Sequence, residues 1–111
     1  MTAKQIYENA IALLGYTDSA AFQRKALPAI NKTYYELFQI FSNNDTDFEA
    51  IESLNDEVVL PQKAFVSALP LGVASMIALG EGDGELQQYF ASEYDRAVKR
   101  FNRKEQIITS Y

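Results

Sequence analysis

The chain contains no cysteine and no histidine. Without cysteine there is no thiol nucleophile, no disulfide, and no cysteine-ligated zinc or iron–sulfur centre. Without histidine the chain lacks the usual general base and the usual transition-metal ligand. Most common catalytic constellations are therefore absent, whereas carboxylate-only chemistry and oxygen ligation of Mg²⁺ or Ca²⁺ stay open. We therefore expect a protein that is not an enzyme and has no cofactor and no small-molecule substrate.

Long apolar runs are also scarce. The longest candidate, residues 64–79, is shorter than the roughly 18 apolar residues that span a bilayer, and it contains Pro70. Residues 1–14 do not have the pattern of a secretory signal, because Glu8 and Asn9 interrupt the apolar run. We expect a soluble protein made in the cytoplasm, without membrane contact.

The apolar residues that are present predict helices. The 111 residues suit a single domain, 1–111, and 48 % of them are hydrophobic. Apolar spacing of three to four predicts helices over about 3–14, 19–41, 61–79 and 85–101, an all-α fold built as a small bundle of about four helices. The predicted buried faces are Ile6, Ala10, Leu13 and Leu14; Phe22, Ala26, Ile30, Tyr34, Leu37, Phe38 and Phe41; Phe65, Leu69, Val73, Met76, Ile77 and Leu79; and Leu86, Tyr89, Phe90, Tyr94, Ala97, Val98 and Phe101.

Local signals mark the helix ends. Thr2 is the expected cap of the first helix and Gly15 its end, and Thr17 or Asp18 is the expected cap of the second. Pro28 predicts a kink in one continuous second helix, and Pro70 with Gly72 a kink in the third. The third helix is apolar on nearly every side, so it is either central in its own domain or covered by a neighbouring subunit.

Two segments lack a clear place in the bundle. Residues 43–60 form an acidic loop or arm between the second and third helices, in which "DFEAIESL" suggests a helical turn or two and "EVVL" a short edge strand or extended segment. Residues 102–111 form a C-terminal tail whose "QIITSY" suits a strand or arm added to another chain.

The stretch "GEGDGE", residues 80–85, has three interpretations. As a calcium loop starting at Glu81 it fails, because the sixth position is Leu86 and the twelfth is Ser92. As a phosphate loop it lacks the lysine that follows the glycines. The preferred interpretation is a helix joint, in which glycine ends one helix and Asp83 caps the next, with adventitious cation binding as the alternative.

Charge is segregated along a chain of net charge −5. The acidic middle has three interpretations: a carboxylate metal site, a mobile solvated arm, or a face for a basic partner. The basic end also has three: a solvated helix end, a phosphate-contacting stripe, or a contact with the acidic middle of an identical neighbour. Such a head-to-tail contact makes rings. The candidate interface residues are Asp45, Asp47, Glu49, Glu52, Asp56 and Glu57, and Arg96, Lys99, Arg100, Arg103 and Lys104.

The order of these features resembles a known family. Four features follow one another: an acidic stretch with "LP" (56–61), an apolar alanine-rich helix (64–79), an Asp/Glu/Gly turn (80–85), and a helix with Phe90, Tyr94 and basic residues. In addition, "ALPAINKTYYEL" (26–37) is similar to the family's earlier helix. Together they resemble the small helical head–tail connector (adaptor) proteins of tailed bacteriophages and their prophages. The extra prolines, Pro28 and Pro70, depart from some relatives.

The resemblance implies a structural ring subunit with no catalytic residues. Its partners would be copies of itself, the portal protein and tail-completion proteins, with passing contact to duplex DNA at most. It would lie in the host bacterial cytoplasm during assembly and in the virion neck of an active phage. The alternative is a small helical protein-binding or regulatory module of bacterial or prophage origin.

Overall fold

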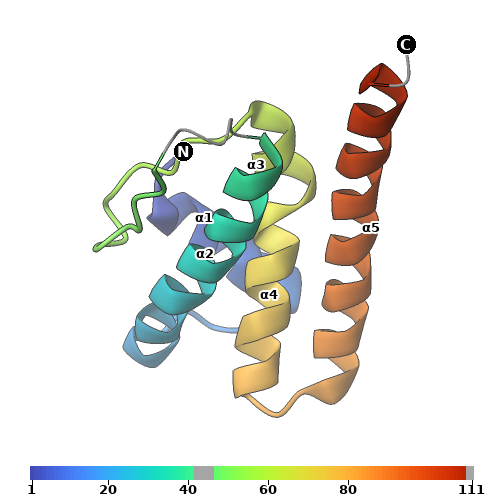
Figure 1. Cartoon of the computed structure of the whole chain (residues 1–111). Helices are drawn as coiled ribbons and strands as arrows, with labels where there is room; N and C mark the ends of the chain where they lie inside the picture. The colour runs from blue at the N-terminus through green and yellow to red at the C-terminus, as the bar shows by residue number, and fades with distance from the viewer. Residues whose placement is uncertain (42–46, 110–111) are drawn as a thin grey trace.

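The protein is an all-α bundle, as the sequence predicts. The computed structural model describes residues 1–41 and 47–109, with side chains up to Phe101. The helices are α1 (Ala3–Leu14), α2 (Ala20–Phe41), α3 (Gln62–Ser67), α4 (Leu69–Gly80) and α5 (Gly84–Thr109), and Figure 1 shows α4 between α2 and α5. α3 and α4 occupy the third predicted helix, which is divided at Ala68.

Both ends of α1 are formed by the residues predicted to cap it. The Gln5 amide donates to Thr2 Oγ1 over 3.2 Å, and the Thr2 amide donates to Gln5 Oε1 over 2.9 Å, a reciprocal capping box. Gly15 ends the helix with φ +73°, a left-handed conformation that glycine adopts without a Cβ clash.

The start of α2 corrects one prediction. Neither Thr17 nor Asp18 caps the helix; Ser19 does, because its Oγ accepts the Phe22 amide at 3.1 Å. Asp18 instead accepts the Tyr7 hydroxyl of α1 and the Gln23 side chain, so its carboxylate is engaged across the turn. Pro28 lies inside α2, which continues through it to Phe41 as one helix.

The division between α3 and α4 falls two residues before Pro70. Ala68 has φ −133° and ψ −52°, outside the helical range, and Pro70 lies in the first turn of α4, where its missing N–H costs no helical bond. The sequence predicts a kink at Pro70 and Gly72 inside one helix, whereas the chain forms two helices divided at Ala68.

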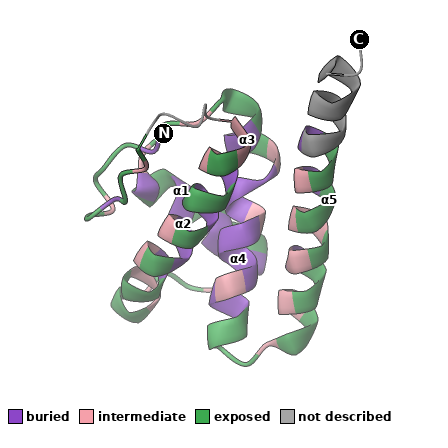
Figure 2. Cartoon of the chain, in the orientation of Figure 1, coloured by how far each residue is buried: buried purple, intermediate pink, exposed green. Residues whose placement is uncertain are grey.

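α4 is central in its own domain, which decides between the two predicted alternatives. It packs against α1, α2, α3 and α5, and its buried residues face all of these neighbours. Figure 2 shows α4 as the most continuously buried helix of the bundle. The bundle itself therefore covers most of the apolar surface of α4, apart from Leu79 at the end of that helix.

The prediction that the third helix is too short to cross a membrane is wrong. By length and composition, the 19 residues Gln62–Gly80 are apolar enough to cross a membrane. They are, however, divided at Ala68 and mostly buried against the rest of the bundle, as expected of a core helix.

Three predicted core residues lie at the surface. Leu13, Leu79 and Tyr89 are 47 %, 65 % and 58 % exposed. In α1 the buried face is rotated from the predicted one, because the buried positions include Ala3, Tyr7 and Ile11 in addition to Ile6, Ala10 and Leu14.

α5 extends beyond its predicted end. The helix continues from Gly84 to Thr109, past the predicted helix end near Phe101, so the predicted C-terminal tail is helical as far as Thr109. Helical hydrogen bonding satisfies the backbone of this polar stretch, whereas an added strand would need a partner edge. Residues 110–111 lie outside the described part of the chain.

We predict that Gly72→Ala destabilises the bundle. A Cβ at Gly72 would lie 2.6 Å from the Thr33 methyl group and 3.0 Å from the Tyr94 ring, so α2 or α5 would have to move away from α4. Overpacking of this kind costs about 1–3 kcal/mol, measurable by urea unfolding. Gly80→Ala is the control: it meets nothing within 4 Å and should leave stability unchanged or slightly raised. Equal stability of the two variants would contradict the close packing at Gly72.

Candidate interaction surfaces

The described acidic segment, residues 47–60, is attached to the start of α1. The amides of Ala3 and Lys4 donate to the carbonyls of Asp56 and Leu54 over 2.9 and 2.8 Å. These amides belong to the first turn of a helix, which has no partners for them within the helix. The segment therefore satisfies donors that α1 would otherwise leave to water, and it is held by backbone geometry instead of by its charges.

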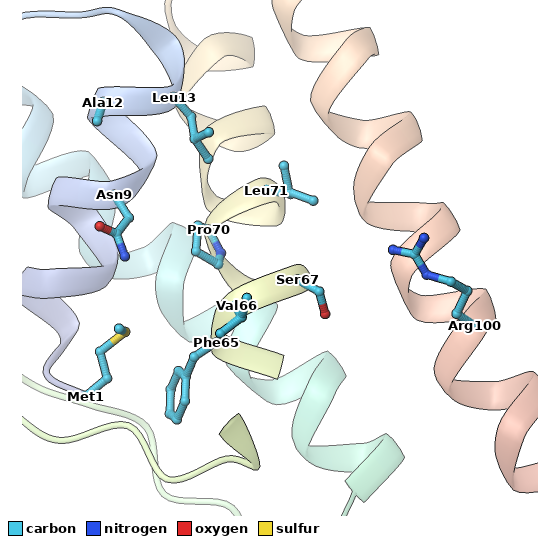
Figure 3. A pocket seen from close by; sticks show the side chains of 10 residues that line it. All are labelled: Met1, Asn9, Ala12, Leu13, Phe65, Val66, Ser67, Pro70, Leu71 and Arg100. Carbon is cyan, nitrogen blue, oxygen red and sulfur yellow. The ribbon is translucent and has the colours of Figure 1, made fainter. Parts of the chain in front are cut away.

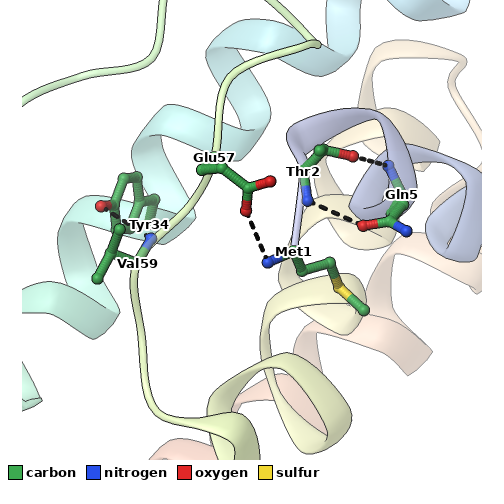
Figure 4. Close-up of polar contacts among 6 residues, drawn as sticks. All are labelled: Met1, Thr2, Gln5, Tyr34, Glu57 and Val59. Carbon is green, nitrogen blue, oxygen red and sulfur yellow. Dashed lines mark hydrogen bonds and ion pairs between the residues drawn. The ribbon is translucent and has the colours of Figure 1, made fainter.

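A short extended stretch continues this attachment. The Val58 amide donates to the Met1 carbonyl over 3.0 Å, and the Val59 amide donates to the Tyr34 hydroxyl over 3.2 Å (Figure 4). Thr2 and Glu57 form an isolated antiparallel bridge. Within residues 47–61 there is no helix, so the helical turn predicted for "DFEAIESL" is wrong there.

Apolar anchors hold the inner side of the segment. Ile51 and Val58 are buried, and the Phe48 ring lies 4.9 Å from the ring centre of Tyr34. The Asn31 side chain of α2 bonds both backbone groups of Ile51, accepting its amide at 2.8 Å and donating to its carbonyl at 3.0 Å. These contacts tie residues 47–60 to α1 and α2.

The carboxylates of this segment point outward. Glu57 pairs with the N-terminal ammonium of Met1 over 3.0 Å (Figure 4), and Asp56 accepts the backbone amides of Glu52 and Ser53. Five of the six predicted acidic residues are exposed: Asp47, Glu49, Glu52, Asp56 and Glu57. The sixth, Asp45, lies outside the described residues.

The predicted basic residues lie on α5. Arg96 pairs with Glu93 over 3.1 Å and Lys99 with Asp95 over 2.9 Å, each within one helical turn. Both cations remain about 70 % exposed (72 % and 68 %), so these pairs are weak surface pairs that leave the charges available. Arg100 is exposed beside them, whereas the side chains of Arg103 and Lys104 lie outside the described residues.

The acidic and basic groups lie at opposite edges of the molecule. Figure 1 shows the segment between α2 and α3 at one edge and α5 at the other, with α4 between them. Among the described residues, the ion pairs do not join the two groups within one chain. We name them the acidic edge (Asp47–Leu60) and the basic edge (Arg96, Lys99 and Arg100).

An apolar groove lies between α1, the α3–α4 junction and α5. Its volume is about 680 Å³, and Figure 3 shows Arg100 reaching towards it from α5. The groove was not predicted, because the helical spacing of Leu13 from Ile6 and Ala10 assigned Leu13 to the core, whereas the buried face of α1 is centred on Tyr7, Ala10 and Leu14. The lining residues are Met1, Asn9, Ala12, Leu13, Phe65, Val66, Ser67, Pro70, Leu71 and Arg100.

The stretch Gly80–Glu85 is a helix joint, as preferred from the sequence. Gly82 has φ +73°, and Asp83 caps α5 by accepting the Leu86 amide at 3.3 Å. Asp83 also accepts the Tyr16 hydroxyl at 3.2 Å, which ties the joint to the end of α1. Across the described residues, there is no group of three or more acidic side chains placed to hold a metal ion.

The groups with shifted pKa values are structural ties. Burial, and then the bond to Asp18, raises the pKa of Tyr7 to about 12. The Tyr7 hydroxyl in turn lowers the pKa of Asp18, and burial with Glu36 raises the pKa of Tyr94. Burial is the main cause for the two tyrosines and the bond from Tyr7 the main cause for Asp18, and each group is bonded to a neighbouring part of the chain.

The comparisons with known proteins identify no family. Neither the protein-family models nor the curated proteins nor the solved structures contain a match to this chain.

We predict that Asn31→Ala loosens the acidic edge. The change removes both bonds to Ile51 and leaves a buried backbone pair without partners, at about 1–3 kcal/mol. Hydrogen exchange at the Ile51 amide should therefore become faster, while the amides of α4 keep their protection. Asn55→Ala, at an exposed position, is the control. Unchanged exchange at Ile51 in the Asn31 variant would contradict the anchoring.

Proposed function

We propose that the protein is a non-enzymatic structural subunit of a phage or prophage head–tail connector, a ring that docks on the portal protein and extends the DNA channel. The observation that carries the proposal is the placement of two oppositely charged edges on opposite sides of one small bundle. The resemblance of residues 26–37 and 56–100 to connector proteins supports the same function.

Opposite edges of opposite charge favour a head-to-tail contact. An acidic edge on one copy and a basic edge on the next use different surfaces, so each added copy exposes both edges again. Such a series closes into a ring when the rotation between neighbours divides a full turn. Exposed charge pairs add little affinity one by one, but they select the partner surface and the orientation of approach.

The overall charge suits a DNA channel. A net charge of −5 disfavours tight binding to the phosphate backbone, so duplex DNA would pass with transient contact at most. In this function the partners are further copies, the portal protein and tail-completion proteins. The protein acts in the host bacterial cytoplasm during assembly and in the virion neck of an active phage.

We predict that reversing the basic edge prevents self-association. Light scattering of the wild-type protein at increasing concentration, alone and with the portal protein, should show particles of many chains that dissociate as salt rises. Arg96→Glu with Lys99→Glu should remove these particles, because both edges then carry negative charge. Arg24→Glu, an exposed cation on α2, is the control that keeps them.

Rescue makes this test specific. The acidic-edge variant Glu49→Lys with Glu52→Lys should restore contact with the Arg96/Lys99 variant when the two are mixed. A wild-type protein that stays a monomer or dimer, even with the portal protein present, would overturn the proposal and favour the small regulatory module.

A further inference from the structure

Two hollows on the surface each border a highly exposed valine. Val66, which is 72 % exposed, lines the apolar groove between α1, α4 and α5 (Figure 3). Val59, which is 75 % exposed, lines a smaller hollow of about 210 Å³ with Phe38, Phe41, Leu60 and Pro61. Exposed apolar side chains beside apolar hollows mark surfaces that a partner covers.

The groove has a charge preference. Arg100 supplies a guanidinium to its wall, and none of its described lining residues carries a carboxylate. A fitting occupant therefore combines an apolar side chain with nearby carboxylates. Along the extended stretch at the acidic edge, Glu57 and Val59 are exposed while Val58 between them is buried, so one face presents an acid and an apolar residue together.

We propose that the occupant of the groove is the acidic edge of a second copy. Val59 of one copy enters the groove of its neighbour, and Val66 of that neighbour enters the hollow beside Val59. Carboxylates of the acidic edge then face Arg100. This inference rests on the proposed assembly into rings and identifies the surfaces through which neighbours meet.

Charge argues against the basic end of the chain as the occupant. Residues 102–111 include Arg103 and Lys104, which would meet Arg100 as like charges. The groove and the small hollow are also different surfaces of one chain. The contact is therefore heterologous, and it leaves a free groove and a free Val59 at the two ends of any open series.

The test uses two surface variants with a matched control. Val59→Asp and Val66→Asp each place a carboxylate at an exposed position, so folding should be unaffected by circular dichroism and thermal unfolding. Leu79→Asp is the control, since Leu79 is 65 % exposed but lines neither hollow. Sedimentation velocity should show that each valine variant alone is monomeric, whereas Leu79→Asp assembles like the wild type.

Mixing the two variants tests the direction of the contact. The Val59→Asp variant keeps an intact groove with Val66, and the Val66→Asp variant keeps an intact Val59, so these two surfaces can still bind each other. The opposite contact would bring the two introduced carboxylates together. An equimolar mixture should therefore form particles of two chains and stop there. Assembly of both single variants at wild-type strength would overturn this inference while leaving ring formation itself intact. A wild type that never associates, alone or with the portal protein, would overturn both.

Discussion

The apolar surface on all sides of α4 is the constraint on which the rest of the structure depends. A helix of this kind must be covered in every direction, and α1, α2 and α5 provide that cover. Close approach is possible where Gly72 faces Thr33 and Tyr94, because a side chain there would separate the helices. Once α4 is covered, the bundle needs no neighbour for its core. Surfaces left over from this packing, and not the core, are therefore the ones available for function.

Two consequences of this packing produce the charged edges. α5 packs mainly against α4, so the rest of its surface stays in water and carries Arg96 and Lys99, with Arg100 at the wall of the groove. On the other side, the chain between α2 and α3 returns across the start of α1, where the Asp56 and Leu54 carbonyls satisfy free helix amides. Ile51 and Val58 point inward and the carboxylates outward. Backbone bonds thus hold this segment in place, although its carboxylates repel one another.

The sequence predicted the helices well where local rules decide them, and poorly where contacts across the chain decide them. Thr2, Gly15 and Asp83 act where predicted, because a cap depends on the neighbouring few residues. Periodicity placed Leu13, Leu79 and Tyr89 in the core, although Leu13 and Tyr89 lie off the faces that their neighbours bury and Leu79 lies at the exposed end of α4. The attachment of residues 54–58 to the start of α1 joins positions far apart in the chain through backbone bonds, which no local sequence pattern predicts. The groove was missed for the same reason, since it depends on where Leu13 and Val66 point.

The central claim is that copies of this protein meet through opposite edges, and crosslinking tests it most directly. Since the chain has no cysteine, Glu52→Cys and Lys99→Cys in one chain introduce the only two thiols. The two positions lie on opposite edges, so a disulfide between them, which needs Cα atoms within about 7 Å, joins different copies. Under mild oxidation the account predicts a ladder of linked chains on a non-reducing gel, absent when Arg24→Cys replaces Lys99→Cys. A single-chain band, or the same ladder from the control, would contradict it.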